Sequence, residues 1–250
     1  MKCLLALLVL LTLAAPANAQ FNGCRKGPCV RTTSTPPVTI PTFTSQSTGG
    51  PNSFSTTTAP TWSATIDIGA AFTGRFVVAM WRVVSNATMT AADFNGVSAG
   101  FANIGSYASG SYKFALAYGV VNTGTTATLN VSVDDVTFGS TIYIWTCQVS
   151  DLLSTTPTTG FNFSTATVPG TATVNVSSSG AVLAYGQLFG GTFTNPTFTT
   201  PNDPGVTADH SSTFTVQGTK NNSAAFTPAS VSVTAAGTPG DVIVSLATFR

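Results

Sequence analysis

The stretch "TATLNVSV" at residues 126–133 returns almost unchanged as "TATVNVSS" at residues 171–178. In both copies apolar side chains alternate with Thr, Asn or Ser, a period of two that gives a β-strand one apolar and one polar face. Each copy is followed by a turn and then by a run that is apolar on both faces, "TIYIWTCQV" at 141–149 and "GAVLAYGQLFG" at 180–190. The chain thus repeats a couplet of a half-polar strand and a fully apolar strand.

Looser copies of the couplet are "WSATIDIGAAFTGRFVVAMWRVV" at 62–84 and "ASVSVTAAGTPGDVIVSLATF" at 229–249. In layered β structures, outer strands show one face to water, whereas covered strands read as continuous apolar runs. The unequal spacing of the couplets argues against a solenoid or a propeller. The sequence therefore predicts an all-β fold, a single antiparallel β-sandwich over 61–250 with each couplet as a hairpin. Jelly-roll, lectin-like and immunoglobulin-like topologies stay open.

Two further segments, "FNGVSAGFANIG" at 94–105 and "SYKFALAYGVV" at 111–121, predict one more hairpin. Helices are not expected, because Glu is absent and β-branched residues are frequent.

The first 19 residues predict export. Lys2 precedes the apolar run "CLLALLVLLTLAA", and Ala17 and Ala19 supply the small residues of a cleavage site. A transmembrane helix would need about 20 apolar residues, and this run is shorter. We therefore expect a signal peptide at 1–19, a mature chain without a transmembrane helix, and a secreted, periplasmic or surface location.

Export also decides how the cysteines are interpreted. In the segment 20–31, "CRKGPC" favours a small disulfide loop between Cys24 and Cys29, because exported thiols meet an oxidising compartment. Cys147 lies in a strand-like run, where we expect it to be a small buried hydrophobe. Residues 32–60 are rich in Thr, Ser and Pro and predict a linker or arm. The alternative is that "PPVTIPTF" at 36–43 adds an edge strand.

Charged residues make up only 7% of the chain, and its net charge is +1. No basic stripe is available to neutralise phosphates, so nucleic acid is not an expected partner.

The body also resembles β-sandwich proteins of bacteria and their phages that have no assigned chemistry. The resemblance covers roughly 120–250 and lies in "TATVNVSSSGAVLAYGQLFG", "GVTADHSSTFTV" and "GDVIVSLATFR". It implies a virion-surface or secreted surface protein. The leader "FNGCRKGPC" similarly resembles cysteine-pair leaders of exported bacterial proteins.

His210 is the only histidine, and Asp209, Ser211 and Ser212 are its neighbours in "TPNDPGVTADHSST" at 200–213. A catalytic triad needs side chains that converge, whereas neighbours in an extended loop point apart, so we expect a solvated loop histidine. A hydrolase would have to bring Asp residues together in space, since the chain has no Glu.

The same loop is the candidate calcium site. Asn202, Asp203 and Asp209 offer the oxygen ligands that hard cations prefer, although Asp in a Pro/Gly loop is more often part of a turn. No other cofactor is expected.

For a sugar ligand, the candidates are Trp62, Tyr107 and Tyr112, because exposed aromatic rings can stack on sugar faces. Trp62 begins a half-polar strand, and the two tyrosines flank the turn "YASGSY". Trp81 and Trp145 lie in the most apolar strands and are expected in the core.

These observations favour an exported, non-enzymatic module with a structural or display role at a cell surface, in a matrix or on a virion. The alternative is a carbohydrate-binding module, with calcium as a stabilising ion, and a hydrolase that uses Asp residues ranks third. The partner stays open between a surface glycan and another structural protein.

Overall fold

The computed structural model describes residues 39–46, 52–54, 61–83, 87–107, 112–135, 140–165, 170–199, 205–212, 214–223 and 225–250. Over these residues the chain forms antiparallel β-strands, and its one helical element is a single 3₁₀ turn at Val149–Asp151. No helix in the described ranges is long and apolar enough to cross a membrane. The prediction of an all-β, antiparallel chain is confirmed. The expected signal peptide and the Cys24–Cys29 loop lie outside the described residues.

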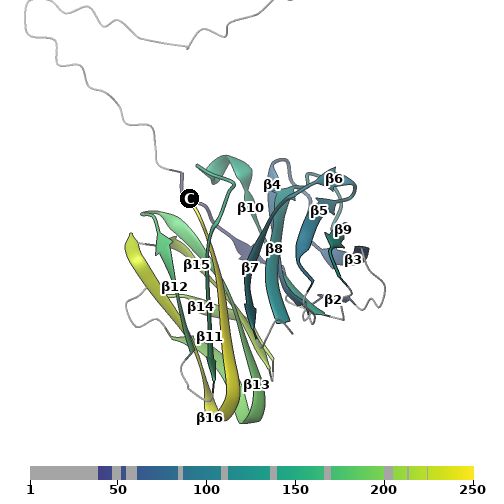
Figure 1. The fold of residues 1–250 in the computed structure, drawn as a ribbon. Helices are drawn as coiled ribbons and strands as arrows, with labels where there is room; N and C mark the ends of the chain where they lie inside the picture. Colours follow the sequence, from purple (N-terminus) through teal and green to yellow (C-terminus); the bar gives the residue numbers. More distant parts are fainter. Residues whose placement is uncertain are drawn as a thin grey trace, which may run out of the picture. The chain divides into compact units, whose positions relative to one another are not determined.

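The strands form three sheets (Figure 1). The first, which we call the central sheet, has the strand order β1-β10-β4-β8-β7, and β2 pairs separately with β10. Its strands are β1 (Thr44–Ser45), β2 (Asn52–Phe54), β4 (Arg75–Val83), β7 (Gly100–Tyr107), β8 (Tyr112–Val120) and β10 (Ser140–Gln148).

The second, the outer sheet, has the order β3-β9-β5-β6. Its strands are β3 (Thr61–Asp67), β5 (Met89–Phe94), β6 (Val97–Ser98) and β9 (Thr126–Val133). The third sheet has the order β11-β16-β13-β15-β14, with β12 paired to β16. Its strands are β11 (Thr158–Thr165), β12 (Gly170–Val176), β13 (Gly180–Thr199), β14 (Thr207–Ser211), β15 (Thr215–Ser223) and β16 (Phe226–Phe249).

The central sheet is covered on both faces. Val77, Ala79 and Trp81 of β4 pack in a core with the outer sheet, whereas Phe76 and Val78 pack in a second core with the third sheet. None of these five side chains is more than 1% exposed. Successive side chains of a strand point to opposite faces, so a strand buried on both faces has to be apolar at every position. This explains the continuous apolar runs of the sequence.

The prediction that each couplet forms a hairpin is wrong. β3 pairs with β9 in the outer sheet, and β4 and β10, which follow them in the chain, pair with each other in the central sheet. A hairpin would put the half-polar and the apolar strand in one sheet and leave an apolar face in water. The couplet instead crosses from one sheet to the next. The hairpin expected around "YASGSY" is confirmed, with Tyr107 opposite Tyr112.

In the third sheet, the couplets take another form. β12 and β13 both pair with β16 and not with each other, and the fourth couplet is the 24-residue strand β16 itself. β12 pairs with the first part of β16, and β11 pairs with its last part. Val242 and Val244 face a third core within this sheet, whereas Ile243 and Ala247 face the central sheet. The described chain is therefore three stacked sheets, where the sequence predicted two layers of one sandwich.

The segment expected as a linker or arm contributes to the body where it is described. Thr44 and Ser45 pair with β10, and β2 pairs with the same strand. The ring of Phe43 is 3% exposed and lies 5.2 Å from that of Phe249. The side chain of Asn221 donates to the Phe43 carbonyl at 2.9 Å and accepts from its N–H at 2.8 Å. A two-residue edge strand, β1, follows "PPVTIPTF", whereas residues 39–43 of that segment itself form no strand.

Arg75 begins β4 and is fully buried. Its guanidinium donates to six backbone carbonyl oxygens at 2.8–3.4 Å, those of Ile68, Gly69, Ala70, Val121, Thr123 and Gly124. These carbonyls lie in the loops from β3 to β4 and from β8 to β9, which both cross between the outer and the central sheet. Burial lowers the pKa of Arg75, and the carbonyls take the place of water around its charge. Arg75 therefore fixes two crossovers at once.

We expect Arg75→Met to lower the free energy of unfolding by about 3 kcal/mol, because the loop carbonyls lose charge-assisted hydrogen bonds without regaining water. Urea denaturation measures the loss. Arg82→Met is the matched control in the same strand: the Nε of Arg82 is buried without a hydrogen-bond partner, so this change should cost less than about 1 kcal/mol. Equal losses in the two variants would contradict the role given to Arg75.

Candidate functional site

Trp62 lies in the core and not at the surface. Its side chain is 3% exposed and packs edge-on against Trp81, with ring centroids 5.5 Å apart at 89°. It occupies an inward position of β3, whose burial alternates strictly along the strand. Its face is therefore not exposed for stacking on a sugar. Trp81 and Trp145 are buried in the central sheet, as the sequence predicted.

Tyr107 and Tyr112 come together at the end of the β7–β8 hairpin. Their rings stack at 5.8 Å and 8°, and Phe163 and Phe189 of the third sheet pack against them. The hydroxyl of Tyr107 donates to Asp241, and this hydrogen bond raises the pKa of Tyr107 to about 12. Tyr107 is thus held inside the cluster, and of the two tyrosines Tyr112 is the one that borders open space.

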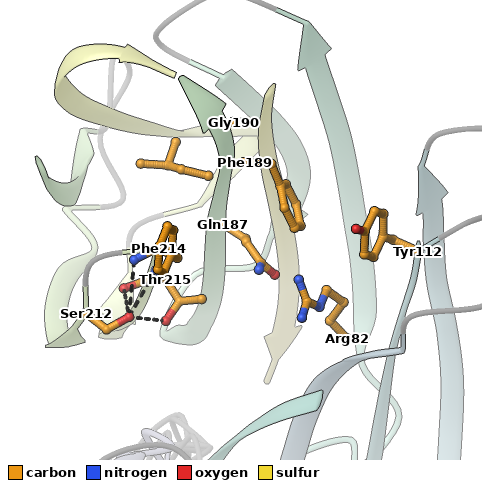
Figure 2. A pocket seen from close by; sticks show the side chains of 9 residues that line it. Arg82, Tyr112, Gln187, Phe189, Gly190, Ser212, Phe214 and Thr215 are labelled. Atoms are coloured by element: carbon orange, nitrogen blue, oxygen red, sulfur yellow. Dashed lines mark hydrogen bonds between the residues drawn. The ribbon is translucent and has the colours of Figure 1, made fainter. Parts of the chain in front are cut away.

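Tyr112 lines an open cleft of about 400 Å³ (Figure 2). We call it the Arg82 cleft, and its main lining residues are Arg82, Tyr112, Gln187, Phe189, Phe214 and Thr215. β4 and β8 of the central sheet supply the first two, whereas β13, the β14–β15 turn and β15 supply the others.

The guanidinium of Arg82 packs against two rings of the cleft, whose own centroids are 4.9 Å apart. Its central carbon lies 5.3 Å from the ring centroid of Tyr112 and 5.3 Å from that of Phe189. Both distances are within the range of cation–π attraction. In Figure 2, Arg82 and Gln187 reach toward each other from opposite walls, with Tyr112 and Phe189 beside them. Arg82 is the only charged residue among the described residues of the lining.

Hydrogen bonds order the floor of the cleft. The Oγ of Ser212 is 2.8 Å from the Oγ1 of Thr215 and accepts from the Thr215 N–H at 3.2 Å. Thr215 also shares a short hydrogen bond with the buried hydroxyl of Tyr143. Tyr185 donates to the Oε1 of Gln187 at 2.8 Å, which fixes the orientation of that amide. The polar groups of the cleft are therefore held in place by the core beneath them.

Sequence reasoning singled out Tyr112 and missed Arg82, Gln187 and Phe189. One signal was available: Arg82 interrupts the apolar run "FVVAMWRVV", and a charge within a fully buried strand needs a reason. Gln187 breaks the run "AVLAYGQLFG" in the same way. The sequence could not show that Arg82 and Gln187 come together, because they lie in strands of different sheets.

Of the candidate calcium ligands, Asn202 and Asp203 lie outside the described residues. Asp209 is described, and it accepts a hydrogen bond from the Thr219 hydroxyl. Desolvation raises the pKa of its carboxyl, and the Thr219 hydrogen bond acts in the opposite direction. Within the described ranges, no three His, Cys, Asp or Glu side chains gather in a way that could hold a metal ion.

The serines next to His210 form hydrogen bonds with other residues and not with its ring. The hydroxyl of Ser211 donates to the Pro196 carbonyl at 2.9 Å, and Ser212 bonds to Thr215. The ring of His210 is half-buried and lies 6.1 Å from that of Tyr143, beside a register irregularity of β14. The described contacts of these residues serve packing and turn geometry.

Cys147 is buried on β10 without a disulfide partner, as a small side chain of the central sheet's second core. Burial, followed by the nearby charge of Asp151, raises the pKa of its thiol to about 12. A thiol of that kind reacts slowly, because the thiolate is the nucleophile.

Thiol titration tests this burial together with the expected loop disulfide. At pH 8 the folded mature chain should react with Ellman's reagent at no cysteine, and the unreduced chain in guanidinium should react at Cys147 alone. Reduction in guanidinium should then expose Cys24 and Cys29 as well. Three reactive thiols in the unreduced, unfolded chain would contradict the disulfide, and a fast reaction of the folded chain would contradict the burial of Cys147.

Comparisons with family models, with curated proteins and with solved structures each found no match.

Proposed function

We propose that the protein is an exported, non-enzymatic module with a structural or display role at a cell surface, in a matrix or on a virion. The N-terminal run and its small-residue site support export, and the resemblance of residues 120–250 to bacterial and phage β-sandwich proteins supports a surface role. In this proposal the Thr/Ser/Pro-rich N-terminal segment joins the body to its anchoring partner.

One observation carries the proposal: the outward face of the outer sheet is built mostly from short hydroxyl and amide side chains, with Asp67 and Asp93 as acidic members. Thr61, Ser63 and Thr65 are exposed on β3, and Thr128 is exposed on β9. Ser63 donates to Asn130 at 2.6 Å, and Asn130 in turn donates to Asp93 at 2.7 Å. Such a face stays hydrated and presents little charge, which suits a body that is displayed at high density.

Fractionation of a producing bacterial culture tests the proposal. We expect an antibody against the chain to detect it in the envelope, medium or particle fraction, with an N-terminus at Gln20 by Edman sequencing. A variant without residues 2–19 should stay in the cytosol. A wild-type product that keeps its leader and remains cytosolic would contradict export. Turnover in a screen of glycoside, ester and peptide substrates would contradict a non-enzymatic role.

A second candidate function is carbohydrate binding, which the Arg82 cleft favours. The cleft combines exposed aromatic surface with hydroxyl and amide groups, and sugars offer the matching apolar faces and hydroxyls. The two functions are compatible, since a displayed module can attach to a glycan.

A further inference from the structure

Arg82 is a half-buried residue of β4 and carries the only charge in the described lining of the cleft. Its Nε is buried and has no hydrogen-bond partner within the described chain, and the described lining of the cleft contains no carboxylate. Arg75, at the other end of the same strand, instead fills its donors with six carbonyls. The described lining therefore leaves the charge of Arg82 unbalanced at the cleft, where an anionic ligand would pair with it.

The position of Arg82 suits an anion of one particular shape. The rings of Tyr112 and Phe189, whose centroids are 4.9 Å apart, both contact the guanidinium, and the Arg82 side chain reaches into the cleft beside them (Figure 2). The planar fork of an arginine pairs bidentately with a carboxylate. Because the site is assembled before binding, little ordering of the side chain opposes the pair.

The rest of the cleft suits a sugar ring attached to that carboxylate. Phe214 is 57% exposed at the rim and offers a face for stacking. The Nε2 of Gln187, whose Oε1 accepts from Tyr185, and the hydroxyl of Ser212 are groups of the lining that can bond to sugar hydroxyls. A volume of about 400 Å³ is at the lower end for small-molecule sites, which fits one acidic sugar residue of a chain that continues into solvent.

We propose that the Arg82 cleft binds a carboxylate-bearing saccharide, with Arg82 paired to the carboxylate of a uronic or sialic acid residue and Phe214 and Tyr112 against the sugar. The inference rests on the second candidate function, carbohydrate binding, and adds the class of sugar and the residue that selects it.

Isothermal titration of the purified mature chain tests the proposal with matched ligands. Oligogalacturonate and sialyllactose are the acidic arms, and neutral galactose oligomers and lactose are their counterparts. We expect at least one acidic ligand to bind tenfold or more tightly than its neutral counterpart. The arm that binds identifies the source of the carboxylate, and inorganic sulfate serves as a simple anion without a sugar.

Three variants assign the effect to Arg82. Arg82→Met should abolish the preference for the acidic ligand, and Arg82→Lys, which keeps the charge without the fork, should weaken acidic binding about tenfold. Lys220→Gln removes one positive charge from a residue outside the cleft lining and should leave affinity unchanged. The melting temperature of Arg82→Met should stay within about 4 °C of that of the wild type, so a loss of binding would not reflect unfolding.

Several results would overturn the inference. Equal affinity for acidic and neutral ligands would contradict recognition of a carboxylate, and so would acidic binding that survives in Arg82→Met. Either result would leave carbohydrate binding itself in place. If sulfate binds as tightly as the acidic ligand, the sugar ring does not contribute to affinity, and the cleft would be a simple anion site. No binding of any saccharide at millimolar concentration would remove both the inference and carbohydrate binding, but not the display role, which culture fractionation tests separately.

Discussion

Burial of the central sheet on both faces is the constraint on which the rest of the structure depends. The apolar segments of β4, β8 and β10 are almost completely removed from water. Their side chains alternate between a core with the outer sheet and a core with the third sheet. Neither neighbour is optional, because loss of one would expose a full apolar face. The couplets follow from this constraint, since each half-polar strand lies in a layer that meets water.

Polar groups between the layers add specificity to this packing. Arg75 joins the two crossovers at one end of the central sheet. On the opposite face, the indole of Trp145 donates to the Thr219 hydroxyl at 2.8 Å, and the hydroxyl of Tyr143 meets that of Thr215. A sliding or rotation of the third sheet would leave these buried groups unpaired, which is costly. The Arg82 cleft opens beside this bonded seam and gains its fixed geometry from it.

Alternation and apolar runs were sufficient to predict strands, their antiparallel class and the β7–β8 hairpin. They could not predict that couplets cross between sheets, because the pattern of β3 or β4 shows how many faces are covered and not which strand lies alongside. The same limit applies to the site. Tyr112 was identifiable by type. Trp62 could have been placed inside as well, because Trp62, Ala64 and Ile66 form the apolar face of a strand that alternates with Ser63, Thr65 and Asp67. Arg82 and Gln187 meet only through packing of distant segments.

The most direct test of the account is native-state hydrogen exchange across the central sheet. Amides of 76–81, 114–117 and 142–147 should exchange only through global unfolding, with protection that falls together as urea is added, because both faces of these strands are covered. The two-residue strand β6 at the edge of the outer sheet should exchange by local opening at much lower free energy. Central-sheet amides that exchange as fast as this edge would contradict a sheet buried between two others.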